Sequence, residues 1–145
     1  MRWAMVMALG VGCGMAPGPT AEGFSTQPFQ SIPSRGHQYL VAIRTSPQPP
    51  ARGALSVQYT IASSVDGTPA SGLVLSVVPW MPAMDHGTSV VPSVVEASPG
   101  TYMVANVDLF MAGWWVLRTT ISGAAPAAGD AGTVGDYVEP SFEIP

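Results

Sequence analysis

Charge is the scarcest property of this sequence. The 145 residues include five arginines, nine acidic residues and no lysine, so the net charge is −4 at pH 7. Proteins that bind nucleic acid need clustered cations to neutralise phosphates. The sequence therefore predicts a protein without a nucleic-acid partner.

Cysteine and histidine are almost as scarce. The single cysteine, Cys13, has no partner for an internal disulfide, so the fold must depend on a hydrophobic core. The two histidines, His37 and His86, have no spacing typical of a Ser-His-Asp site. The carboxylates Asp85 and Asp108 do not form a pair suited to acid–base catalysis. We therefore expect a protein that is not an enzyme.

The N-terminus has the pattern of an export segment. Arg2 precedes an apolar run at residues 3–12, which is too short to cross a bilayer as a helix but is typical of a secretory signal. The lone Cys13 after this run resembles a bacterial lipoprotein cleavage site, which predicts a lipid anchor in the membrane. A plain secretory signal cleaved elsewhere, or a tethering helix, remains open. Lipoprotein and secreted protein alike would lie outside the cytoplasm, in the periplasm or cell envelope.

The segment after the cysteine has the composition of a linker. Residues 14–36 are rich in proline, glycine, serine and threonine and have no sustained period. The sequence thus predicts an export segment at 1–13, a flexible linker at 14–36 and one folded domain at 37–145. A domain of that length can bury a hydrophobic core.

The folded part has a strong strand signal. The chain has 16 glycines and 15 prolines, which favour turns and short strands over helices. Residues 54–62 alternate between apolar and polar side chains, as in a strand with one buried face. Residues 73–80 are apolar almost throughout, which predicts a strand buried on both faces, and Pro79 and Pro82 are expected to end its ladder. Further strands are expected at 37–44, 89–97, 101–109, 114–121 and 136–145.

The spacing of these strands indicates the fold. About seven short strands, separated by regular turn signals, are typical of a two-sheet sandwich. No stretch has a convincing helical period. We therefore predict an all-β fold, an immunoglobulin-like antiparallel β-sandwich.

The sequence MPAMDHG, residues 81–87, is the candidate metal site. Met81, Met84 and His86 carry soft to borderline ligands that together suit Cu(I), and suit Cu(II) or Zn(II) less well. If the segment is extended, residues 84 and 86 point the same way, and Pro82 can turn Met81 toward them.

Three other residues could contribute to such a site. Asp85 is a candidate acceptor that orients the imidazole, and Met111 or Met103 could complete the ligand set. A purely structural interpretation stands beside this one, because methionine commonly fills gaps in cores and a histidine in a turn often bonds a backbone carbonyl. The other histidine, His37, is expected to be exposed or packed at an edge rather than to bind metal.

Three short motifs follow one another between residues 81 and 117. Their residues are Met81, Pro82, Met84, His86 and Gly87, then Pro99, Gly100 and Tyr102, then Met111, Gly113, Trp115 and Leu117. This order resembles the YtkA-like domain family, which is related to FixH-type proteins and has the pattern Met-Pro-x-Met-Gly-His-Gly, Pro-Gly-x-Tyr, Met-Pro-Gly-x-Trp-x-Leu. The family's upstream strands would correspond to residues 37–78. Asp85 replaces the usual glycine, and Ala112 replaces the usual proline.

The resemblance implies a fold and a function. It implies a small immunoglobulin-like sandwich that is exported or anchored to the membrane. FixH-type relatives are associated with copper supply to respiratory oxidases. A copper-handling or copper-delivery domain is therefore implied, with Cu(I) favoured and a copper-accepting envelope protein, such as a respiratory oxidase component, as partner. Tyr102, Trp115 and Leu117 would then serve packing, and Trp114 would point outward or pack under the loop at 122–135.

A second function class remains open. The chain could be a non-enzymatic envelope lipoprotein that serves as a protein-interaction or structural module. Sulfur atoms of Met81 and Met84 that point into the core, away from His86, would favour this alternative.

Overall fold

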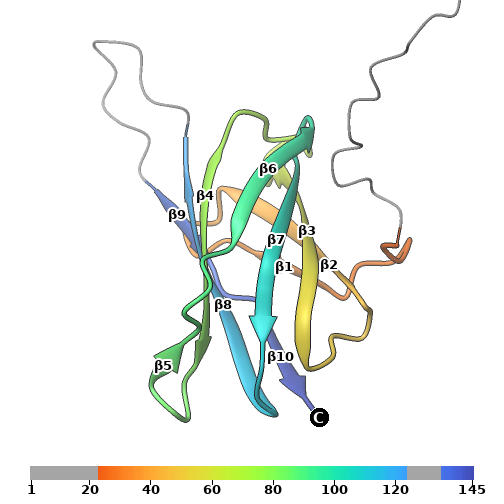
Figure 1. The fold of residues 1–145 in the computed structure, drawn as a ribbon. Helices are drawn as coiled ribbons and strands as arrows, with labels where there is room; N and C mark the ends of the chain where they lie inside the picture. Colours follow the sequence, from red (N-terminus) through yellow and green to blue (C-terminus); the bar gives the residue numbers. More distant parts are fainter. Residues whose placement is uncertain (1–22, 124–134) are drawn as a thin grey trace, which may run out of the picture.

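The computed structural model describes residues 23–123 and 135–145 (Figure 1). The predicted export segment at 1–13, with Cys13, and residues 14–22 of the predicted linker lie outside these ranges. No helix in the described ranges is long and apolar enough to cross a membrane.

The described residues form two antiparallel sheets that make a sandwich (Figure 1). Sheet A has the strand order β1-β2-β3-β7-β6, and sheet B has the order β10-β8-β4-β5, with β9 also paired to β8. This arrangement confirms the predicted all-β sandwich. The strands are β1 Gln30–Pro33, β2 Tyr39–Ser46, β3 Gly53–Ser63, β4 Val74–Met81, β5 His86–Gly87, β6 Ser93–Ser98, β7 Thr101–Leu109, β8 Gly113–Ser122, β9 Asp136–Val138 and β10 Ser141–Ile144.

The core lies between the inner faces of the two sheets. In β3, the side chains of Leu55, Val57, Tyr59 and Ile61 are buried, as the alternation in the sequence predicts. One hydrogen bond crosses the core, because the hydroxyls of Tyr59 in sheet A and Thr119 in sheet B lie 2.9 Å apart. Burial raises the pKa of Tyr59, so this phenol stays neutral. The two sheets are therefore joined by a polar contact as well as by apolar packing.

Strand β1 lies inside the segment for which the sequence predicts a linker. Gln30 in this strand exchanges two hydrogen bonds with the Ser141 backbone, at 3.0 and 3.3 Å. Just before it, Phe29 packs on Phe142 with ring centroids 5.6 Å apart. The sandwich therefore begins before His37. Its first strand depends on tertiary contacts, which local composition does not reveal.

Asp136, in β9, ties down the turn between β1 and β2. Its carboxylate accepts hydrogen bonds from the hydroxyl of Ser34 and from the backbone N–H groups of Gly36, Gln38 and Tyr137. Burial raises the pKa of Asp136, but these bonds outweigh that effect and hold the pKa below its ordinary value. His37 lies in this turn, is exposed and has a φ of 56°. It is thus exposed as expected, although it precedes the strand rather than opening it.

Strand β4 is not buried on both faces, contrary to its prediction. Leu75 and Val77 are buried, whereas Val74 and Val78 are 62% and 45% exposed. Within the described residues, sheet A covers only one face of sheet B, so alternate side chains of β4 meet solvent. The prediction from the unbroken apolar run, that both faces of this strand are buried, is therefore wrong.

Pro79 does not end the β4 ladder, although its sequence position suggests that it should. It pairs with Leu117 of β8, whose N–H donates to the Pro140 carbonyl on the opposite side of β8, at 2.8 Å. The Pro79–Leu117 pair is therefore a non-hydrogen-bonded pair of the ladder. The missing N–H of Pro79 points away from β8, so the ladder loses no bond and continues to Met81.

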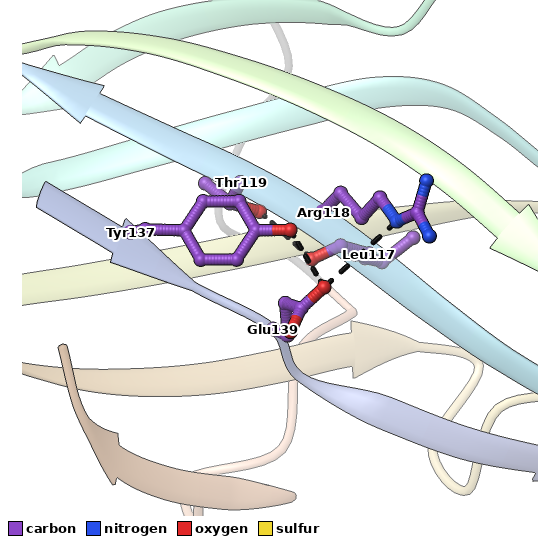
Figure 2. Close-up of polar contacts among 5 residues, drawn as sticks. All are labelled: Leu117, Arg118, Thr119, Tyr137 and Glu139. Atoms are coloured by element: carbon purple, nitrogen blue, oxygen red, sulfur yellow. Dashed lines mark hydrogen bonds and ion pairs between the residues drawn. The ribbon is translucent and has the colours of Figure 1, made fainter. Parts of the chain in front are cut away.

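Strands β9 and β10 lie along one side of β8. The Tyr137 hydroxyl donates to the Glu139 carboxylate at 2.6 Å, and Arg118 Nε lies 3.8 Å from the same oxygen. Figure 2 draws both contacts. In β8 itself, the Thr119 hydroxyl donates to the Leu117 carbonyl at 3.2 Å. On the outer face of sheet B, Tyr137, Glu139 and Arg118 thus form a small polar network that links β8 to the end of β9, whereas the Thr119 hydroxyl lies in the core.

Candidate metal centre

The MPAMDHG segment forms the hairpin that joins β4 to β5, at one end of the sandwich (Figure 1). Met81, the last residue of β4, pairs directly with His86, the first residue of β5. The turn between them has hydrogen bonds from Met84 N to Met81 O, at 3.2 Å, and from Asp85 N to Pro82 O, at 3.3 Å. Directly opposite residues face the same side of an antiparallel pair, so Met81 and His86 share a face. The segment is a turn rather than an extended stretch, so the alternation that was expected to put residues 84 and 86 on one side does not apply here.

Asp85 gives this turn its shape. Its φ is 53°, which lies in the left-handed region. Aspartate is one of the few residues besides glycine that adopt this conformation. Glycine adopts the same conformation at little cost, so either residue can form this turn.

Gly87 brings β5 close to β4. A Cβ atom at this position would lie 2.7 Å from the Pro79 carbonyl oxygen and 3.4 Å from the Trp80 ring, so no side chain fits. The Arg118 guanidinium lies 4.3 Å from the centroid of the same Trp80 ring, in a cation–π contact. The hairpin is therefore held by two side chains, Trp80 and Arg118, that the sequence analysis did not assign to the site.

His86 is half-buried and is fixed on two sides. Its Nδ1 lies 3.0 Å from the Gly87 carbonyl oxygen. Because a carbonyl only accepts, Nδ1 carries a hydrogen, and Nε2 is the nitrogen that can offer a lone pair to an ion. The Phe110 ring forms an offset stack with the imidazole, with centroids 6.1 Å apart and planes inclined by 13°. The orienting acceptor is thus the Gly87 carbonyl rather than the predicted Asp85 carboxylate, and Nε2 is the available ligand atom.

The methionines of the predicted ligand set lie in different environments. Met81 is 3% exposed and belongs to the core, whereas Met84 in the turn is 54% exposed. Met111 is half-buried against the core, in the loop between β7 and β8. That loop lies beside the hairpin, because a Cβ at Gly113 would be 3.3 Å from the terminal carbon of Met81. The structure therefore brings Met81, Met111 and His86 to one end of the molecule.

Met103 is not brought to this end. Its sulfur accepts a hydrogen bond from Gln58 Nε2 at 3.7 Å, within sheet A. Leu109 ends β7 six residues later, which corresponds to about 20 Å of extended chain. Met103 is therefore a packing residue and is too distant to complete the site.

The donors at the hairpin fit a soft cation by their chemistry. In the part of the chain that the structure describes, no three or more His, Cys, Asp or Glu side chains are grouped to hold a metal ion. The hairpin offers one imidazole nitrogen and nearby thioethers, a combination that suits Cu(I). The burial of Met81 also agrees with the structural interpretation, whereas the exposed Met84 does not point into the core. The condition set for the structural alternative, both sulfurs in the core and away from His86, is not met, because Met84 is exposed and Met81 shares a face with His86.

The second motif has a structural role. Gly100 has a φ of 74°, and a Cβ there would lie 2.8 Å from the Ile61 carbonyl oxygen. Nearby, the Tyr102 hydroxyl donates to the Ala70 carbonyl at 2.7 Å and accepts from the Leu73 N–H at 3.0 Å. Tyr102 is buried, as expected, and it also fixes the connection between β3 and β4.

The third motif packs in and against the core at the end of the molecule where the hairpin lies. Trp115 and Leu117 are fully buried, and Trp114 is 50% exposed, so the expectations for all three are confirmed. Trp115 Nε1 donates to the Met111 carbonyl at 2.9 Å, which fixes the β7–β8 loop. Gly113 has a φ of 127°, a conformation suited to glycine.

Phe110 is the main residue that the sequence analysis missed. It is 44% exposed, stacks on His86 and meets Trp115 edge-on, with centroids 5.6 Å apart and planes inclined by 70°. No spacing rule connects Phe110 to a histidine in another hairpin. Its position just before Met111 was the only local signal.

The comparison with known proteins agrees with these motifs. The sequence matches the YtkA-like family over residues 36–120. The match runs from the β1–β2 turn into β8 and so includes all three motifs. No curated protein and no solved structure matches the chain. Since the family match spans more than half of the sequence, the chain belongs to the YtkA-like family.

Proposed function

We propose that this chain is an extracytoplasmic copper-handling domain that carries Cu(I) at the β4–β5 hairpin. The observation behind the proposal is that the Gly87 carbonyl engages Nδ1 of His86, which leaves Nε2 as its ligand atom, and that His86 shares a face with Met81. Imidazole and thioether donors together favour Cu(I). The expected relation to FixH-type proteins, which are associated with copper supply, supports the same proposal.

Each donor has its own part in the proposal. His86 supplies the oriented ligand, because the Gly87 carbonyl and the Phe110 ring fix its imidazole. Met84 supplies an exposed thioether that a partner protein can replace by ligand exchange. Met81 and Met111 supply sulfur from the core side. Such a site holds the cargo ion on one exposed side, where it can be handed on.

The proposal also assigns a location and a partner. The domain would be a non-enzymatic lipoprotein of the cell envelope, anchored through Cys13, which the charged and apolar N-terminal pattern supports. Its partner would be a copper-accepting envelope protein, such as a respiratory oxidase component.

An anaerobic Cu(I) competition titration tests the proposal. The Cys13→Ser chain is used, because a free thiol itself binds Cu(I). We expect one-to-one binding, and His86→Ala in the same background should weaken it by about tenfold or more. Unchanged affinity in His86→Ala would remove the hairpin from consideration.

Met103→Leu is the matched control for thioether loss. It removes a methionine sulfur that lies within sheet A, far from the hairpin. Copper affinity should stay at the level of the Cys13→Ser chain, whereas Met84→Leu should weaken it. Equal losses in the two variants would indicate nonspecific binding to methionine.

The second candidate function is a protein-interaction module of the envelope. It is favoured by Trp114, which is 50% exposed on the outer face of sheet B, and by the core position of Met81. If the Cys13→Ser chain binds no Cu(I), this function replaces the copper proposal.

A further inference from the structure

We infer that Phe110 determines the specificity of the hairpin site and makes it favour Cu(I) over Cu(II). The inference rests on the proposed function and adds a selection between oxidation states. Its basis is the stack of Phe110 on His86, with ring centroids 6.1 Å apart and planes inclined by 13°.

The Phe110 side chain is held in place by contacts with two other rings, although it lies at the surface. Its ring lies nearly parallel to that of His86, with centroids 6.1 Å apart, and it meets Trp115 edge-on, with centroids 5.6 Å apart. Trp115 is fully buried, and its Nε1 is bonded to the Met111 carbonyl at 2.9 Å. A ring supported on both sides keeps its position when an ion reaches the imidazole.

This ring forms an apolar wall that limits how His86 can be approached. The Gly87 carbonyl occupies Nδ1, and the Phe110 ring lies nearly parallel to the imidazole and beside it, with centroids 6.1 Å apart. The open ligand atom is Nε2, beside an apolar aromatic surface. Water molecules that would complete the shell of a bound ion find no hydrogen-bond partner on that surface.

The preference of the site for Cu(I) over Cu(II) then follows from the charge of each ion and from the ligands that it favours. Removing an ion from water costs more for a divalent than for a monovalent cation, because the cost rises with the charge. Cu(II) prefers tetragonal sites with nitrogen and oxygen ligands, whereas thioethers suit Cu(I). An apolar wall and nearby methionine sulfur therefore both disfavour Cu(II).

The test compares Phe110→Asn with Phe110→Leu in the Cys13→Ser chain. Asparagine replaces the apolar wall by a polar group, whereas leucine keeps it apolar. The affinities for Cu(I) and Cu(II) and the reduction potential of the bound copper are measured for both. We expect Phe110→Asn to reduce the Cu(I)-to-Cu(II) preference about tenfold, which lowers the potential by about 59 mV. Phe110→Leu should stay close to the parent protein.

A metal-free readout tests the stack itself. In the NMR spectrum of the parent, the Phe110 ring should shift the His86 ring protons, and this shift should disappear in Phe110→Leu. Thermal unfolding checks that both variants fold, which the 44% exposure of Phe110 favours.

The outcomes separate the two claims. If the parent binds no copper, the proposed function fails, and this inference fails with it. If the parent binds copper but Phe110→Asn keeps the same preference, only the role of Phe110 is overturned. If the NMR spectrum of the metal-free parent shows no shift of the His86 ring protons, the role of Phe110 is also overturned.

Discussion

At the scale of single residues, the shape of the hairpin depends most directly on Asp85. Its φ of 53° lies in a region that costs an alanine about 1–2 kcal/mol and costs glycine almost nothing. We expect Asp85→Ala to be about 1 kcal/mol less stable than Asp85→Gly, as measured by urea unfolding. Equal stability of the two variants would mean that the turn has another conformation in solution.

Gly87 is the second residue with a sharp prediction. Its Cβ would lie 2.7 Å from the Pro79 carbonyl oxygen, so Gly87→Ala must push β5 away from β4. We expect a loss of about 1–3 kcal/mol in the free energy of unfolding. Gly135→Ala is the control, since a Cβ there meets its nearest neighbour at 3.5 Å. Comparable losses in the two variants would contradict the close approach of the strands.

The residues of the candidate site were only partly predictable. Ligand chemistry singled out Met81, Met84, His86 and Met111 as candidates, because soft donor types are visible in the sequence. The direction of each side chain was not predictable, because it depends on whether the segment is a turn or a strand. The contact of His86 with Phe110 depends on two hairpins meeting in space, and no local pattern contains that information.

At the scale of elements, Asp136 couples β9 to the β1–β2 turn. Its folded-state pKa lies below the ordinary value of 3.8, because its hydrogen bonds outweigh burial. The ionised carboxylate therefore stabilises the fold above the unfolded-state pKa, and this contribution is lost as the pH falls through the folded-state pKa. We expect the stability of the parent to fall more steeply below a pH of about 5 than that of Asp136→Asn.

The comparison is made by measuring the free energy of unfolding of the parent and of Asp136→Asn over this pH range. The exposed carboxylates Asp66 and Glu96 also have lowered pKa values, but they titrate in both proteins and cancel. Parallel curves would show that Asp136 does not titrate with folding.

The network on the outer face of sheet B should be weaker than the Asp136 contacts. The Arg118–Glu139 ion pair spans 3.8 Å, and both side chains are more than a third exposed. Exposed pairs contribute about 1 kcal/mol or less and are screened by salt. We expect Glu139→Gln to cost less than Asp136→Asn, and its cost should shrink in high salt. Denaturant unfolding at two salt concentrations measures both effects.

The strands themselves were largely predictable. The prediction at 101–109 coincides with β7, and the alternation at 54–62 marks β3, because one buried face leaves a period of two. The sequence suggested about seven strands, and the structure has ten in the described residues. The difference arises from β1, from the two-residue β5 and from the division at Pro140 between β9 and β10. Such short elements are stabilised by their neighbours rather than by their own composition.

At the scale of the whole molecule, the N-terminal boundary of the folded unit is testable. A chain that starts at His37, as the sequence alone suggested, lacks β1 and the Phe29–Phe142 contact. A chain that starts at Gly23 keeps both. We expect the shorter chain to be less stable by about 3 kcal/mol, since a large aromatic contact and a strand are lost. Equal unfolding midpoints would place β1 outside the cooperative unit.

The position of Pro79 has a consequence for how copies of this protein behave together. β5 pairs only with the last two residues of β4, Trp80 and Met81, so among the described residues the preceding stretch of β4 is paired with β8 along one edge and has no strand along the other. The outward side chains of Val74 and Val78 are exposed. Because the chain has few charges, electrostatic repulsion between copies of the protein is weak. A proline without an N–H interrupts the row of donors at which another molecule could add a strand. Pro79 therefore disfavours the addition of a strand from another copy at this edge, and with it edge-to-edge aggregation.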